Sequence, residues 1–152
     1  AFLKGAAATM VEVCAFEDSY FPSESRAIKQ FLLGLRGRVE PDVIFTHSRL
    51  DAHQDHRELN ALTMNVFRDH LVLEYEIPKW DGDLCERNTY IPLLPGMIER
   101  KIDLLMEHFA TQRSKDWFHA DVFRGLARMR GMECRSPSFF AEAFTVRKLA
   151  IM

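Results

Sequence analysis

The chain has 152 residues, of which 47% are hydrophobic and 28% charged, and its formal net charge is −2. This balance is typical of a globular protein with a real core, and it excludes a disordered chain. It also gives no electrostatic reason to expect nucleic acid or an anionic membrane as a partner, and no apolar run approaches the roughly 18 residues of a membrane span. The three cysteines are widely spaced and odd in number, so we expect reduced thiols in the cytoplasm.

Strands and helices are predicted to alternate through the first half of the chain. The alternation depends on short apolar runs for the strands and on apolar residues at helical spacing for the helices. Cys14 falls inside the first apolar run, where we expect it to be a buried small hydrophobe. In chain order we expect a strand at Val11–Phe16, a helix at about Ser25–Arg36, a strand at Val43–Phe45, a helix at about Asp55–Asp69 and a strand at Leu71–Ile77.

The second half of the chain is predicted to hold two helices between two extended segments. Pro95-Gly96 should open one amphipathic helix, and Gly131 should close the other. The remaining expected elements are an extended segment at Thr89–Leu93, a helix at Trp117–Arg130 and a strand at Phe139–Leu149. This order predicts an α/β fold with a mainly parallel sheet and helices on both faces, as one domain over residues 1–152.

Three of the six histidines lie close together, between a predicted strand and a predicted helix. Two of them belong to the segment His53-Gln54-Asp55-His56, which follows the apolar run Val43–Phe45 after a polar loop. Open α/β sheets place their active sites at the carboxyl ends of strands. Two imidazoles and a carboxylate within one turn offer one metal ligand and one supported acid–base group. These residues are therefore a candidate site.

A purely structural interpretation of the same segment is about equally compatible with its spacing. Asp55 followed by Glu58 is similar to a capping box, which would make His53 and His56 surface residues of a helix start. His47, at the end of the predicted strand, is better explained as a hydrogen-bonded structural histidine than as a functional one. The spacing alone leaves both interpretations open.

Several motifs along the chain resemble those of the LmbE-like (PIG-L) N-acetylglucosaminyl deacetylases. They occur in the family's order and span about Val11 to Leu149: Pro41–His47, His53–His56, Glu99–Leu105, Thr111–Phe118, Arg130-Gly131 and Phe140–Phe144. The resemblance implies a Rossmann-like α/β sandwich and hydrolysis of an acetamide with zinc, or another divalent metal, as cofactor. It also implies that His56 is a zinc ligand, that His53 stabilises the tetrahedral intermediate or protonates the leaving amine, and that Asp55 supports His53.

One block of the family's pattern is missing from this chain. The family's other two zinc ligands and its catalytic base come from an A-H-P-D-D-E sequence, which does not occur here. We therefore expect an N-terminally incomplete LmbE-like domain that lacks the first βαβ portion of the fold. On its own it should be a poor deacetylase and prone to associate, because a catalytic zinc needs about three protein ligands. A homo-oligomer is compatible with the sequence.

The expected function is a zinc-dependent hydrolase that removes the acetyl group from an N-acetylated amino sugar of a GlcNAc-type glycoconjugate. One alternative is a metallo-β-lactamase-like hydrolase, whose T-H-x-H-x-D-H motif also contains H-x-D-H. Here, however, His47 lies six residues before His53, whereas that motif needs a spacing of two. Another alternative is a non-catalytic, carbohydrate-binding remnant of the fold.

Overall fold

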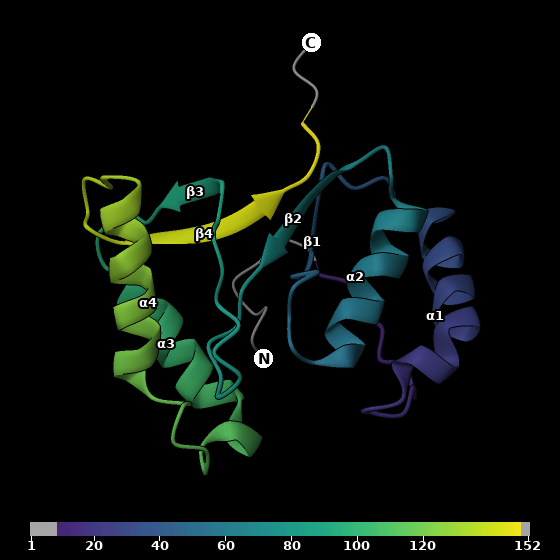
Figure 1. The fold of residues 1–152 in the computed structure, drawn as a ribbon, viewed down its shortest axis with the longest axis horizontal. Coiled ribbons are helices and arrows are strands. Elements are labelled where there is room, and N and C mark those ends of the chain that lie inside the picture. Colours follow the sequence, from purple (N-terminus) through teal and green to yellow (C-terminus); the bar gives the residue numbers. More distant parts are fainter. Residues whose placement is uncertain (1–8, 150–152) are drawn as a thin grey trace. The chain divides into compact units, whose positions relative to one another are not determined.

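The computed structural model describes residues 9–149 as a mixed α/β fold (Figure 1). Its helices are α1 (Phe21–Arg36), α2 (Gln54–Val66), α3 (Met97–His108) and α4 (Ala120–Glu133), with a short 3-10 turn η1 (Ala110–Gln112). Its strands are β1 (Val43–His47), β2 (Leu71–Tyr75), β3 (Thr89–Pro92) and β4 (Ala141–Val146). The α/β class is confirmed, and every helix and strand expected after the first is present with shifted ends.

The four strands of the described residues form one mixed sheet in the order β1-β2-β4-β3. β1 and β2 run parallel, with Val43 opposite Leu71 and His47 opposite Tyr75. β2 and β4 run antiparallel. The expected mainly parallel sheet is therefore not confirmed, because α3 and α4 follow one another between β3 and β4 and the strand–helix alternation ends there.

The strand expected at Val11–Phe16 is wrong, since residues 9–17 carry no strand. Val13 is 91% exposed, and Cys14 is exposed rather than buried. Residues with high β-propensity form a strand only when they pack against a neighbouring strand. Within the part of the chain that the structure describes, no strand pairs with this segment. The ring of Phe16 instead packs against the rings of two α1 residues, Phe21 and Phe31.

The chain divides into two compact units, each with its own core. In the unit centred on Ala15–Ile77, α1 packs against α2, and the core consists of Ile28, Leu32, Val66 and Phe67. In the unit centred on Tyr90–Glu142, the core consists of Ile98, Ile102, Phe118, Phe123 and Ala127. A single domain over residues 1–152 stays a prediction.

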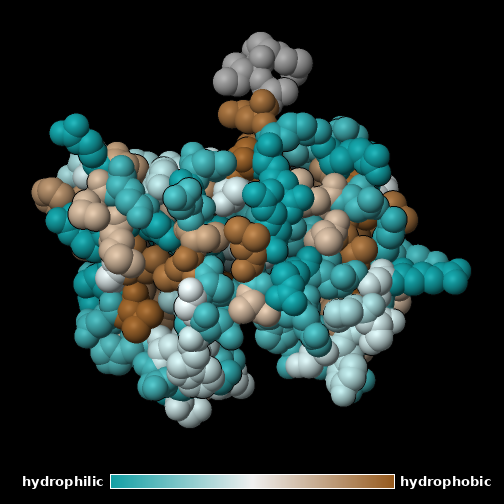
Figure 2. All heavy atoms as spheres, in the orientation of Figure 1, coloured by the Kyte–Doolittle hydropathy of each residue, from teal (hydrophilic) through white to brown (hydrophobic). Residues whose placement is uncertain are grey.

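Hydrophilic residues cover most of the face shown in Figure 2, with apolar patches among them. Several large apolar side chains contribute exposed surface, including Phe45 at 55% and Trp80 at 66%. Within residues 9–149, no helix combines the length and the apolar composition that crossing a membrane requires.

α1 begins at Phe21, earlier than the expected start at Ser25. Pro22 lies in the first helical turn, where its missing N–H leaves no hydrogen bond unmade. The carboxylate of Asp55 accepts a hydrogen bond from the Phe21 N–H at 3.2 Å, so a residue of α2 satisfies the first turn of α1. Because this contact joins residues 34 positions apart, it leaves no local signal in the sequence.

α4 continues through Gly131 to Glu133, so the helix end expected at this glycine is wrong. Gly131 is buried against the chain segment at Phe139 and Phe140. A Cβ atom at this position would lie 2.1 Å from the Phe139 carbonyl oxygen and 2.7 Å from the Phe140 Cα. The close approach of two backbones, and not a helix end, therefore explains this glycine.

Gly131→Ala should lower the free energy of unfolding by about 1–3 kcal/mol, because the backbone at Phe139 and Phe140 must move away from the added methyl group. The matched control is Gly125→Ala in the same helix, where nothing lies within 4 Å of the added Cβ. That control should raise the free energy of unfolding by about 0.5–1 kcal/mol. Denaturant unfolding of both variants measures the two effects, and shifts of the same sign would contradict the close-approach explanation.

Candidate functional site

The predicted site residues lie where β1 ends and α2 begins. β1 ends at His47, a polar loop follows, and His53 is the N-cap of α2 with extended backbone angles. Asp55 and His56 lie in the first turn of α2. The imidazole rings of His53 and His56 have centroids 4.7 Å apart and are tilted by 32°. The two imidazoles therefore lie side by side at the start of α2.

His56 is held through one of its two ring nitrogens. Its Nδ1 lies 2.9 Å from Oδ2 of Asp51, whose side chain is only 4% exposed. An ionised carboxylate can only accept hydrogen bonds, so the contact places a proton on Nδ1 of His56. In the neutral imidazole this leaves the lone pair on Nε2, which is the form of histidine that binds a metal ion.

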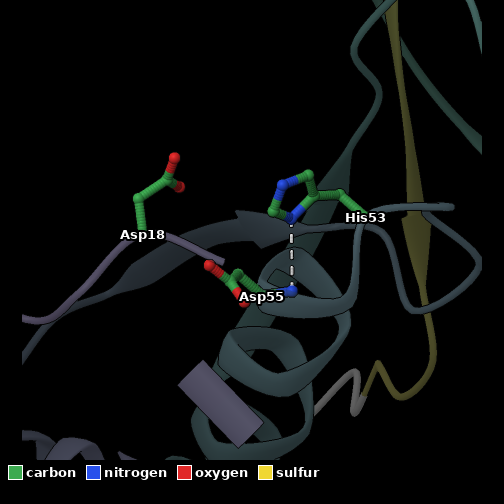
Figure 3. A group of neighbouring side chains, drawn as sticks. All are labelled: Asp18, His53 and Asp55. Carbon is green, nitrogen blue, oxygen red and sulfur yellow. Dashed lines mark hydrogen bonds between the residues drawn. The ribbon is translucent and has the colours of Figure 1, made fainter. Parts of the chain in front are cut away.

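His53 is held in the opposite way. Its Nδ1 accepts a hydrogen bond from the backbone N–H of Asp55 at 3.2 Å (Figure 3). Nδ1 therefore carries the lone pair, and in the neutral imidazole the proton lies on Nε2. The two neighbouring imidazoles consequently differ in tautomer: His53 offers an N–H donor at Nε2, while His56 offers a lone pair there.

The capping contact of His53 is not by itself evidence of a site. His119 is the N-cap of α4 in the same manner, with Nδ1 accepting from the Asp121 N–H at 3.3 Å. The His119 side chain is 65% exposed. What distinguishes His53 is its surroundings, namely the ring of His56 beside it and the buried carboxylate of Asp51.

Asp55 contacts His53 through its backbone, while its carboxylate is engaged elsewhere. One carboxylate oxygen accepts from the Ser19 N–H at 2.6 Å, and the other accepts from the Phe21 N–H. Asp55 is 3% exposed, so this carboxylate is buried against the start of α1. It thereby ties the N-terminus of α1 to the first turn of α2. The expected support of His53 by Asp55 stays a prediction, with the backbone N–H as its visible contact.

Asp18, His53 and Asp55 form a group that could hold a metal ion (Figure 3). Each offers one ligand atom, and these atoms lie within 4.8 Å of one another. The group fits zinc poorly, because Asp18 is exposed, the carboxylate oxygens of Asp55 accept two backbone hydrogen bonds, and Nδ1 of His53 accepts a third. His56 fits better, since the contact of its Nδ1 with Asp51 leaves Nε2 as the nitrogen available to a metal ion. Among the described residues around this site, His56 is thus suited to be one zinc ligand, whereas a catalytic zinc typically has three protein ligands.

His47 belongs to the same cluster, although sequence reasoning favoured a structural role for it. Its ring stacks on that of His56, with centroids 3.9 Å apart and an angle of 21°. Its Nε2 lies 3.0 Å from the Tyr75 hydroxyl. The structural role of His47 and its place in the cluster are compatible, because a hydrogen-bonded histidine can also fix the ring of a neighbour. Sequence reasoning missed Tyr75, because its place opposite His47 is set by the register of β1 against β2 and leaves no local signal in the sequence.

Burial, together with the negative charge of Asp51, raises the pKa of Tyr75 from 10.0 to about 12. The folded state therefore favours the neutral phenol. As the pH rises from about 10 to 12, the unfolded chain loses this proton first. The contribution of Tyr75 to the free energy of unfolding should therefore be complete below pH 10 and should be lost across that interval. Phenolate absorbance of the native protein minus that of Tyr75→Phe isolates this residue. A titration of Tyr75 near pH 10 in the folded protein would contradict the effect of burial.

A buried polar network supports the end of β1. Glu74, 1% exposed, accepts hydrogen bonds from the Arg49 N–H at 3.1 Å and from Nε of Arg147 at 2.8 Å. The guanidinium of Arg147 also donates to the side chain of Asn60, which in turn donates to the His47 carbonyl oxygen at 2.7 Å. The network therefore holds the backbone on both sides of Ser48. Here the loop between β1 and α2, which we call the site loop, leaves the strand.

Residues 2–67 match the family model of PIG-L, described as GlcNAc-PI de-N-acetylase. The match includes β1, the site loop and the whole of α2. It confirms the resemblance to the LmbE-like/PIG-L family over this segment, whose members are GlcNAc-type de-N-acetylases. The resemblance of the later motifs, from Glu99 onward, lies beyond the matched residues and stays a prediction. No curated protein matches the chain.

Proposed function

We propose that this chain supplies the H-x-D-H part of a metal-dependent N-deacetylase that removes the acetyl group from an N-acetylated amino sugar. The observation that carries the proposal is the pair of Nδ1 contacts, in which Nδ1 of His53 faces the Asp55 N–H and Nδ1 of His56 faces the Asp51 carboxylate. From these contacts we infer opposite tautomers for the two imidazoles. Amide hydrolysis with a metal needs both functions side by side, a lone pair to bind the ion and an N–H to donate. The PIG-L match over the same residues supports the same chemistry.

His56 is proposed to hold the metal through Nε2, while Asp51 holds Nδ1. Zinc bound at such a site lowers the pKa of its water to about 7 and polarises the amide carbonyl. Another divalent metal with a preference for nitrogen ligands is compatible with the same imidazole.

His53 is proposed to act as a hydrogen-bond donor toward the reacting group. With Nδ1 occupied by the Asp55 N–H, its proton lies on Nε2. From there it can donate a hydrogen bond to the oxygen that gains negative charge in the tetrahedral intermediate. Proton transfer to the leaving amine requires the imidazolium form, in which Nδ1 also carries a proton and no longer accepts from the Asp55 N–H. Asp55 keeps the ring in place through its backbone, and its carboxylate fixes that backbone against α1.

The test is acetate release from an N-acetylglucosamine conjugate by protein made from its whole coding sequence, with and without a chelator. We expect zinc-restored activity that the chelator removes. Hydrolysis of a β-lactam without acetate release would favour the metallo-β-lactamase alternative. Sugar binding without any turnover would favour the non-catalytic remnant.

The same assay on the 152-residue chain alone should show no zinc-dependent acetate release. One well-positioned imidazole does not enclose a catalytic zinc ion. Robust, chelator-sensitive activity of this chain would mean that other side chains complete the site, with His47 and Asp18 as the first to examine.

A further inference from the structure

Asp51 lies in the loop between β1 and α2, and its two carboxylate oxygens face the two site histidines. Oδ1 accepts a hydrogen bond from the His53 backbone N–H at 2.8 Å. Oδ2 lies 2.9 Å from Nδ1 of His56. The side chain is 4% exposed, so both contacts are shielded from water. One buried carboxylate therefore connects the N-cap of α2 with the imidazole one turn later.

We propose that Asp51 is a positioning residue that sets the tautomer of His56 and anchors the backbone of His53. As an ionised carboxylate it can only accept hydrogen bonds, so each of its two partners must donate an N–H. The proton of neutral His56 then lies on Nδ1, and the lone pair lies on Nε2. The role toward the metal rests on the proposed function, whereas the tautomer follows from the contacts of this chain alone.

The loop around Asp51 is itself held at several points. Asp51 donates its backbone N–H to the Ser48 carbonyl oxygen at 3.1 Å. Its own carbonyl oxygen accepts from the guanidinium of Arg57 at 2.8 Å. The next N–H, that of Ala52, donates to the carboxylate of Asp83 at 2.6 Å. These contacts hold the backbone from which the Asp51 side chain projects.

Asparagine at this position cannot reproduce the carboxylate. It has one accepting oxygen and one donating NH₂ group, whereas the two partners both present an N–H. If the NH₂ group faces His56, the proton of that imidazole moves to Nε2 and the lone pair is lost from the metal side. If the oxygen faces His56, the N–H of His53 loses its acceptor.

The test is the tautomer of His56 in the metal-free chain, read from two-bond ¹H–¹⁵N couplings of the imidazole at alkaline pH, where ordinary imidazoles are neutral. We expect the Nδ1–H form in the native chain. Asp51→Asn should either move the proton to Nε2 or speed hydrogen exchange at the His53 N–H. The matched control is Asp83→Asn, which keeps an oxygen for Ala52 and should change neither signal.

An Nε2–H form of His56 in the native chain would overturn the proposal without any variant. So would an Asp51→Asn chain in which both the tautomer and the His53 exchange rate are unchanged. In protein that binds zinc, Asp51→Asn should weaken zinc affinity by about 10- to 100-fold. Because the tautomer measurement needs neither metal nor turnover, a failure of deacetylase activity would refute the proposed function while leaving the role of Asp51 intact.

Discussion

Replacing His53 by alanine should lower kcat by about 10²- to 10³-fold while the bound metal stays in place. The reason is that His53 offers a proton at Nε2, an interaction made mainly with the transition state, whereas its Nδ1 is used by the helix cap. Metal content and kcat, measured on the same samples, report the two properties separately.

The matched control for His53→Ala is His119→Ala. It removes the same kind of N-cap contact, from His119 to the Asp121 N–H, at the start of α4. Both variants should lose about 0.5–2 kcal/mol of stability through the cap. Only His53→Ala should lose turnover. An equal loss of kcat in both variants would show that the cap, and not the hydrogen bond donated by Nε2, explains the effect.

Replacing His56 by alanine should abolish tight zinc binding, and activity with it. His56 is the imidazole whose Nδ1 is held by Asp51 and whose Nε2 keeps its lone pair. Removal of a metal ligand affects the ion itself, whereas removal of a proton donor affects mainly the chemical step. Zinc content determined by mass spectrometry is the measurement. Zinc lost to the same extent from His53→Ala and His56→Ala would show that the two roles are misassigned.

The helices and the β1–β2 pair could be predicted because their apolar residues recur at helical spacing or in short runs. The pair His53 and His56 could be found for a similar reason, since their spacing places them on one helical turn. A local pattern was sufficient in each case, and the structure brings the two imidazoles together.

The remaining features depend on contacts between distant parts of the chain. The start of α1 depends on a carboxylate from α2, and Gly131 is explained by the backbone at Phe139. Val11–Phe16 has the residue types of a strand, but a strand also requires a paired neighbour.

Two residues of the site cluster lay outside the sequence prediction for the same reason. Asp51 gains its importance from the conformation of a loop, which decides what its carboxylate faces. Tyr75 gains its contact with His47 from the register of β1 against β2. Neither contact follows from spacing along the chain, because both form only when the loop and the two strands have folded against one another.

The decisive measurement is the position of the metal in crystals of zinc-loaded protein, located by its anomalous scattering. We expect zinc about 2.0–2.1 Å from Nε2 of His56, with Asp51 still bonded to Nδ1 and with His53 outside the ligand set. Zinc bound by Asp18, His53 and Asp55, with His56 not coordinated, would contradict the proposed division of roles.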